Sequence, residues 1–171
     1  PYLIPDDQHR VRAQFTFAAA VHVAVVDVDP ATGVVKVLRY LVVGDNGTVI
    51  NPDVVEGQVV GSAAHGISVA LGEGFAYDDD GNLETKTLLE YGKASTMDTP
   101  SIEVEHRPQP SPFTALGQKA VGEGAAIGSP AAIASAVEDA LRPLGAVVEQ
   151  LPLDIEAVWS LANGRASLRT E

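Results

Sequence analysis

One carboxylate in this sequence stands out because of its surroundings. Glu123 is the only acidic residue in the glycine-rich segment GQKAVGEGAAIGSP (117–130), which contains four glycines. Its immediate neighbours are small or apolar, and a carboxylate removed from water holds a proton more readily, as a general base requires. The alternative is an exposed loop glutamate, the commonest fate of this residue type. The segment therefore predicts either a proton-transfer site or a tight loop that permits helix packing.

The spacing of the glycines around Glu123 argues against a dinucleotide-binding fingerprint. Between Gly124 and Gly128 lie three residues where that fingerprint has two, and no strand is predicted immediately before the segment. A helix that begins after glycines can still bind an anion through its free backbone N–H groups. Contact with a phosphate or pyrophosphate group therefore stays open.

A second unusual segment, DVVEGQVVGSAAHGISVAL (53–71), predicts a helix with glycines at positions 57, 61 and 66. Each internal glycine costs about 1 kcal/mol relative to alanine. We therefore expect this helix to lie very close to another backbone or to a ligand. Gln58, between Gly57 and Gly61, could hydrogen-bond such a ligand, whereas its ordinary alternative is an amide that caps or joins helices.

The hydrophobic pattern predicts an α+β fold in a single unit, residues 1–171, with a lead-in segment at 1–13. A mixed sheet with two hairpins is expected to pack against the glycine-rich helix and two C-terminal helices. The expected elements are strands at 14–29 and 34–45, the helix at 53–71, a hairpin at 74–91, a strand at 101–107, a loop at 108–128, a helix at 129–144 that begins at Ser129, a short strand and turn at 145–153 and a helix at 154–163.

Composition excludes several classes of partner. The 171 residues carry a formal net charge of −12, and their 11 basic residues are scattered, which argues against nucleic acid. No membrane span is expected, because no apolar run reaches the length that a span needs. The chain has no cysteine and its four histidines lack ligand spacing, so we expect no metal bound directly by its side chains. A cytoplasmic location is expected.

Three stretches, in this order, resemble a known family. They are GDNGTVINPDVVEGQVVGSAAHGISVAL, YDDDGNL and PSIEVEHRPQPSPFTALGQKAVGEGAAIGSPAAIASAVEDAL. They are similar to the C-terminal part of the molybdopterin-binding large subunit of the xanthine dehydrogenase, aldehyde oxidase and aerobic carbon monoxide dehydrogenase family. The resemblance covers roughly residues 14–163, and the Ala-His-Gly around His65 favours the carbon monoxide dehydrogenase-type branch.

The resemblance implies roles for particular residues. Lys119-Ala120-Val121-Gly122-Glu123 matches the family's Lys-Gly-Val-Gly-Glu segment, so Glu123 takes the place of the catalytic glutamate. Gln58 matches the glutamine of the family's Gly-Gln-x-x-Gly helix, which contacts molybdopterin. The residues expected on the cofactor side are Gln58, Gly57, Gly61, Lys119 and Gly122. Ala120 and Gly124 depart from the family's usual residues, but both are small.

The implied activity is that of a molybdenum hydroxylase, an oxidoreductase that hydroxylates an aldehyde, an N-heterocycle or a similar small molecule with water as the oxygen source. Molybdenum-molybdopterin, in a dinucleotide form, would be shared with a partner chain or a missing upstream segment. Iron–sulfur clusters and FAD are expected on partner subunits of a multisubunit complex. Two alternatives stay open: a non-catalytic cofactor-binding or assembly module with relic motifs, and an unrelated acidic α+β interaction domain.

Overall fold

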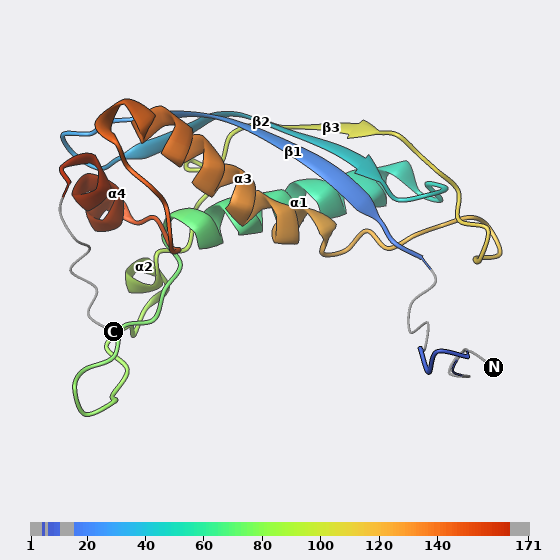
Figure 1. Ribbon diagram of the computed structural model, residues 1–171, viewed down its shortest axis with the longest axis horizontal. Helices are drawn as coiled ribbons and strands as arrows, with labels where there is room; N and C mark the ends of the chain where they lie inside the picture. Colours follow the sequence, from blue (N-terminus) through green and yellow to red (C-terminus); the bar gives the residue numbers. More distant parts are fainter. Residues whose placement is uncertain (1–4, 6, 11–15, 165–171) are drawn as a thin grey trace.

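The computed structural model describes residues 5, 7–10 and 16–164 (Figure 1). Much of the expected lead-in segment and the start of the first expected strand therefore lie outside the described residues. The elements are β1 (Ala19–Val28), β2 (Val35–Asp45), α1 (Pro52–Leu71), α2 (Leu88–Tyr91), β3 (Ile102–His106), α3 (Gly124–Leu141), the 3₁₀ turn η1 (Arg142–Leu144) and α4 (Ile155–Ala162). The predicted α+β class is confirmed.

The sheet is mixed, as expected, with the strand order β1-β2-β3. Strands β1 and β2 form an antiparallel hairpin, and β2 pairs with β3 in parallel. The hairpin turns at residues 29–34, where Gly33 has a φ of 77° and the Asp29 carboxylate accepts hydrogen bonds from the Ala31 N–H and the Thr32 hydroxyl. Helices α1 and α3 both cover the same face of the sheet (Figure 1).

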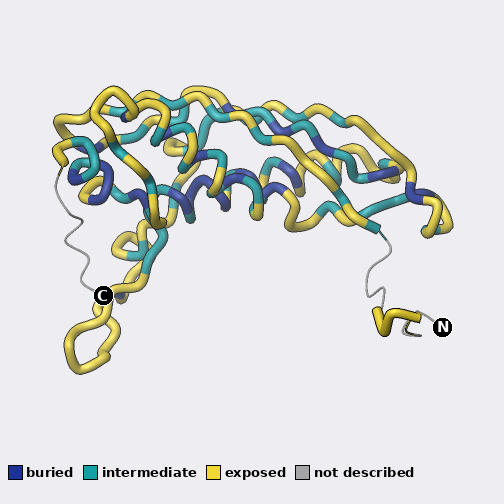
Figure 2. Tube along the Cα trace, in the orientation of Figure 1, coloured by how far each residue is buried: buried dark blue, intermediate teal, exposed yellow. Residues whose placement is uncertain are grey.

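The core lies between that sheet face and the two helices (Figure 2). Its fully buried side chains include Tyr40 of β2, Ile67 of α1 and Ile133 of α3. On the opposite sheet face, Val21 and Val23 of β1 are 63% and 48% exposed. In the described part of the chain, the sheet is therefore covered on one face only.

Helices α1 and α3 meet at a glycine. A Cβ at Gly66 would lie 2.5 Å from the Cβ of Ser129, which is completely buried. The close approach expected of the glycine-rich helix is therefore confirmed at Gly66. At Gly57 and Gly61 nothing among the described residues lies within 4 Å of the position that a Cβ would occupy, so there the expected approach of a ligand stays a prediction.

Helix α3 begins earlier than expected. It starts at Gly124 rather than at Ser129, so Ser129 lies within the helix and its hydroxyl donates to the Ala125 carbonyl (2.6 Å). Pro130, expected in the first turn, lies inside the helix. The glycines that favoured a loop are tolerated here because small residues let α3 approach β1: a Cβ at Gly128 would lie 2.5 Å from His22 Nε2.

The second expected hairpin is reduced to one isolated bridge between Tyr77 and Leu83. Its turn is built as predicted, because the Asp78 carboxylate accepts hydrogen bonds from the Asp80 and Asn82 N–H groups. The residues after Leu83 form the short helix α2 instead of a returning strand. No strand is assigned at 145–153 either; there the Leu153 N–H donates to the Ala70 carbonyl at the end of α1.

Among the helices of the described residues, α1 is the one that has the length and apolar composition to cross a membrane. Its apolar character has another explanation, since Val59, Ala63 and Ile67 are buried in the core with residues of α3. Two acidic residues, Asp53 and Glu56, lie in its first two turns. Packing against the sheet and α3 therefore accounts for α1 as a core helix.

Candidate active site

Glu123 stands at the N-cap position of α3, with its side chain exposed. Its carbonyl accepts the Ile127 N–H (3.1 Å), but its carboxylate makes no capping hydrogen bond to the helix. The expected removal of this carboxylate from water is therefore wrong for this chain by itself: the neighbouring glycines have no side chain, and the alanine side chains are too small to cover it. The structure presents Glu123 outward instead.

The segment that leads to Glu123 is held by the end of β2. The Lys119 N–H donates to the Asn46 carbonyl (2.9 Å), and the Thr48 N–H donates to the Gly117 carbonyl (3.0 Å). The Asn46 side-chain amide donates to the Ala120 carbonyl (2.8 Å). These bonds fix the backbone just before Glu123, so the carboxylate is attached to a rigidly held segment.

Two glycines permit this pairing. Gly47 and Gly117 have φ values of 64° and 77°, in the left-handed region that glycine adopts without strain. A Cβ at Gly47 would overlap the Gly117 carbonyl oxygen, and a Cβ at Gly117 would lie 2.8 Å from the Thr48 hydroxyl oxygen. The turn signal at Asn46-Gly47 in the sequence thus belongs to the support of the Glu123 segment.

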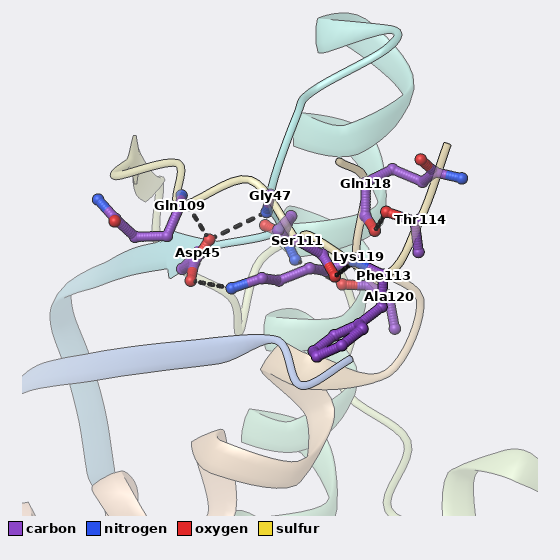
Figure 3. Close-up of polar contacts among 10 residues, drawn as sticks. Asp45, Gly47, Gln109, Ser111, Phe113, Thr114, Gln118, Lys119 and Ala120 are labelled. Atoms are coloured by element: carbon purple, nitrogen blue, oxygen red, sulfur yellow. Dashed lines mark hydrogen bonds and ion pairs between the residues drawn. The ribbon is translucent and has the colours of Figure 1, made fainter. Parts of the chain in front are cut away.

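Asp45 is the polar centre of this support (Figure 3). Its carboxylate lies 2.6 Å from Lys119 Nζ and accepts the N–H groups of Gly47 (3.0 Å) and Gln109 (2.9 Å). The side chains of Asp45 and Lys119 are only 18% and 13% exposed. Burial acts to raise the pKa of Asp45, but the hydrogen bonds from Lys119, Gln109 and Gly47 outweigh it and hold the pKa below its ordinary value.

Lys119 was expected on the cofactor side, and the structure shows its ammonium group paired with Asp45. Within this chain, its interaction is therefore with the loop support. Sequence reasoning missed Asp45, which appeared only as the last residue of an expected strand. The distance of 74 residues between the two partners leaves no local signal of the pair.

Gln58 lies exposed on α1, flanked by Gly57 and Gly61, which are also exposed. Helix α1 begins as predicted, with Pro52 in its first turn and the Asn51 side chain accepting the Val54 N–H (3.2 Å). Because nothing lies within 4 Å of a Cβ position at Gly57 or Gly61, the backbone beside the Gln58 amide is bare in the described structure. A flat group can approach α1 closely here.

A cavity of about 270 Å³ lies between the neighbours of the two candidate residues. Its lining includes Val59, next to Gln58, and Val121 and Gly124, on either side of the Gly122-Glu123 pair. The structure thus brings the first half of α1 and the Glu123 segment to one hollow. The Gln58 and Glu123 side chains themselves are not among the residues that line it.

Two buried polar atoms belong to side chains in the lining of this cavity. His22 Nε2 and Asn46 Oδ1 have no hydrogen-bond partner among the described residues. The other ring nitrogen of His22 lies 2.9 Å from the Tyr40 hydroxyl, and burial holds the pKa of His22 below its ordinary value. Sequence reasoning missed both residues, because a single histidine in a strand and an asparagine in a turn carry no ligand pattern.

Among the described residues, no group of three or more histidine, cysteine, aspartate or glutamate side chains could hold a metal ion. The candidate residues are instead an exposed carboxylate and an exposed amide beside bare backbone, on one α+β domain. This arrangement is suited to a domain that contributes part of a ligand site.

Comparison with known proteins identifies the ligand class. Residues 2–100 match the family described as the molybdopterin cofactor-binding domain. The chain belongs to this family, and the resemblance to the large subunits of molybdenum enzymes is confirmed. The alternative of an unrelated acidic interaction domain is therefore wrong.

Relatives and solved structures agree with this assignment. The chain is 43% identical over 154 residues to the nicotine 6-hydroxylase large subunit of Paenarthrobacter nicotinovorans, in an alignment that covers 90% of this chain and 19% of that protein. It is 37% identical over 145 residues to the carbon monoxide dehydrogenase large chain of Hydrogenophaga pseudoflava, covering 85% and 18%. The structure of quinoline 2-oxidoreductase from Pseudomonas putida 86 superposes with a TM-score of 0.81 at 41% identity, covering 85% and 18%. The chain thus spans about a fifth of the length of these proteins.

Proposed function

We propose that this chain is the C-terminal part of a molybdenum hydroxylase large subunit, in which Glu123 is the catalytic base and Gln58 contacts molybdopterin. One observation supports the base most directly. The Glu123 carboxylate is exposed and makes no capping hydrogen bond to α3, although backbone hydrogen bonds hold the segment before it in place. A glutamate kept only as a helix cap would turn its oxygens back to the N–H groups of α3. The proposed reaction is oxidative hydroxylation of an aldehyde, an N-heterocycle or a similar small molecule with water.

The residues present fit a molybdopterin cofactor. Gly57 and Gly61 leave the backbone of α1 open on both sides of Gln58, so a fused-ring pterin can lie against the helix and exchange hydrogen bonds with the amide. The cofactor, when bound, supplies the redox chemistry that no side chain of this chain can perform. Gly122 contributes a bare backbone next to the carboxylate, because nothing lies within 4 Å of its Cβ position.

Glu123 has one chemical task in this proposal: its carboxylate accepts a proton from the nucleophile as the substrate is attacked. Proton transfer by a positioned side chain contributes roughly 10²–10⁴-fold to rate. The position is set by the Asp45–Lys119 pair and the backbone bonds of Asn46, whereas the exclusion of water must come from the rest of the subunit.

The rest of the proposal concerns partners. The remaining four-fifths of the subunit would complete the molybdopterin site, in a dinucleotide form of the cofactor. Iron–sulfur and flavin subunits would remove electrons, and one relative of this chain is named as a subunit of a dehydrogenase complex. We also propose a cytoplasmic location, which fractionation of the native host would test.

The test is a pair of substitutions in the assembled enzyme. Glu123→Gln should lower turnover by at least 10²-fold while molybdenum and pterin content stay unchanged. Glu149→Gln, an exposed glutamate after η1, is the matched control and should leave turnover unaltered. Normal turnover by the Glu123 variant would show that the base is another residue. Native assemblies with this chain but without molybdenum would favour the non-catalytic assembly module.

A further inference from the structure

Residues 73–94 form an arm that projects from the body on the side of the helices, away from the sheet (Figures 1 and 2). The arm carries some of the most exposed apolar side chains of the described residues. Leu89 is 91% exposed and Leu88 70%. Soluble proteins rarely leave large apolar side chains gathered and open to water unless they form an interaction site.

The base of the arm is firmly attached to α1. The Glu73 carboxylate accepts hydrogen bonds from the Ser68 hydroxyl (2.6 Å) and the Tyr91 hydroxyl (2.8 Å). The Ser68 hydroxyl oxygen in turn accepts the Ala94 N–H (2.8 Å), so both ends of the arm meet at one buried serine of α1. These bonds fix the direction of the arm relative to the helix layer.

The apolar residues of the arm also stand on ordered structure. Thr87 and Glu90 form a reciprocal capping box at the start of α2: the Thr87 hydroxyl oxygen accepts the Glu90 N–H, and the Glu90 carboxylate accepts the Thr87 N–H. Gly92, with a φ of 78°, ends the helix. The chain thus uses several polar groups to shape a single helical turn whose two leucines face outward. An ordered apolar turn of this kind is suited to packing against another protein surface.

We propose that this arm docks, through Leu88 and Leu89, onto the part of the large subunit that lies outside this sequence. The inference rests on the proposed function, because it requires that larger subunit to exist. Two observations favour this occupant over a second copy or an electron-transfer subunit. The arm is part of the domain that the family match covers at residues 2–100, so its neighbour is expected in the relatives as well. The relatives are about five times longer than this chain, which gives the arm a neighbour within one polypeptide.

We expect the apolar surface of the arm to form a permanent interface rather than a transient one. Interfaces that never open are more apolar than those that form and dissociate. The acidic turn of the same arm, with Asp79 and Asp80, is exposed and suited to water. We therefore expect α2 to be covered in the assembled subunit while the acidic turn stays solvated. This difference within one arm provides an internal control.

The experiment places the photo-crosslinking residue p-benzoylphenylalanine at Leu89 in the assembled enzyme, and at Asp80 in a matched control. After irradiation, mass spectrometry identifies the linked peptides. Leu89 should link to large-subunit peptides outside residues 1–171 with at least tenfold higher yield than Asp80. Links to a second copy of this chain or to an iron–sulfur or flavin subunit would overturn the proposal, and so would equal yields at both positions.

A substitution gives a second, independent measurement. Leu89→Glu should leave the thermal unfolding of the isolated chain unchanged, since the side chain is 91% exposed, but should lower recovery of the assembled subunit at least tenfold. Asp80→Asn should affect neither. Unaltered assembly of the Leu89 variant would contradict the docking site. Molybdenum content, measured on the same preparations, separates the two proposals: a molybdenum-free but intact assembly contradicts the proposed function and not the arm.

Discussion

At the scale of single residues, the Asp45–Lys119 pair determines how firmly the Glu123 segment is held. Both side chains are largely buried, and the Asp45 carboxylate carries three donated hydrogen bonds. Removing one partner of such a pair leaves an unpaired charge with little access to water, which costs more than the pair itself contributes. Rigid support therefore depends on both partners.

Lys119→Met should destabilise the isolated chain by about 2–3 kcal/mol, because hydrogen bonds to charged groups contribute about that much and the Asp45 carboxylate would remain. Chemical unfolding measures the change. Asp139→Asn is the control, since Asp139 forms an ion pair with Arg142 whose side chains are 65% and 78% exposed. Such a surface pair contributes at most about 1 kcal/mol. Equal effects of the two substitutions would show that burial does not strengthen the inner pair.

The same carboxylate gives a pH dependence with a definite sign. The pKa of Asp45 is lowered in the folded protein, so its contribution to stability is complete above the ordinary value of 3.8 and is lost as the pH falls through the lower folded value. The difference in unfolding free energy between the native chain and Asp45→Asn should therefore be constant at neutral pH and shrink below about pH 4. A difference that stayed constant down to about pH 2 would contradict the assignment.

Residue identities at the candidate site could be predicted from the sequence further than their environments. The motif around Glu123 and the Gln58 helix both led to the family that the comparisons confirm. Exposure of Glu123 could not be predicted, because small neighbours in the sequence do not determine whether other segments cover them. Asp45 and His22 were missed because their partners are distant in sequence.

At the scale of elements, the three glycines of α1 have two different explanations. Gly66 is required by the crossing with α3, since a Cβ there would collide with Ser129. Gly57 and Gly61 face open space in the described structure. In the isolated chain they only weaken the helix, so their presence needs a reason outside it. The proposed cofactor contact is such a reason.

This contrast predicts that glycine-to-alanine substitutions at positions 61 and 66 have opposite effects on the stability of the isolated chain. Gly61→Ala should stabilise the isolated chain by about 0.5–1 kcal/mol, because alanine favours the helix and meets no neighbour. In the assembled enzyme, it should lower molybdopterin content. Gly66→Ala should instead destabilise the isolated chain by about 1–3 kcal/mol through overpacking. Unfolding curves of both variants, with pterin measured by fluorescence after release, test the prediction; full pterin occupancy in the Gly61 variant would contradict the contact.

Element boundaries failed where tertiary packing overrode local signals. The Ser129-Pro130 pair is a typical helix start, yet α3 begins at Gly124 because the short side chains of its first turns fit against β1 and α1. The second hairpin was predicted from the turn signal Asp79-Asp80-Gly81-Asn82. Its strands did not form, because in the described structure no third strand pairs with them and a hairpin alone is marginal.

At the scale of the whole molecule, the two outer strands of the sheet, β1 and β3, differ in the charge of their exposed side chains. On β3, Glu103 and Glu105 face outward and pair with Arg39 and Arg107, which protects that side with charge. On β1, the outward side chains include Val21, Val23 and Val25, all at least 45% exposed, and Asp27 near the end of the strand. Sheet edges that remain exposed usually carry charges that prevent pairing with other chains. The stretch from Val21 to Val25 lacks them and is therefore suited to being covered.

The isolated chain should consequently self-associate through β1, opposed by the repulsion of its net charge of −12. Raising the salt concentration screens that repulsion without weakening apolar contact, so association measured by light scattering should increase with salt. Val23→Lys places a charge in the middle of the exposed valines of β1 and should keep the chain monomeric under the same conditions. Arg39→Lys, on the charged side, should leave the salt response as it is. If the Val23 variant associates as strongly as the native chain, the surface that mediates self-association lies elsewhere. The projecting arm with Leu89 is then the next surface to substitute.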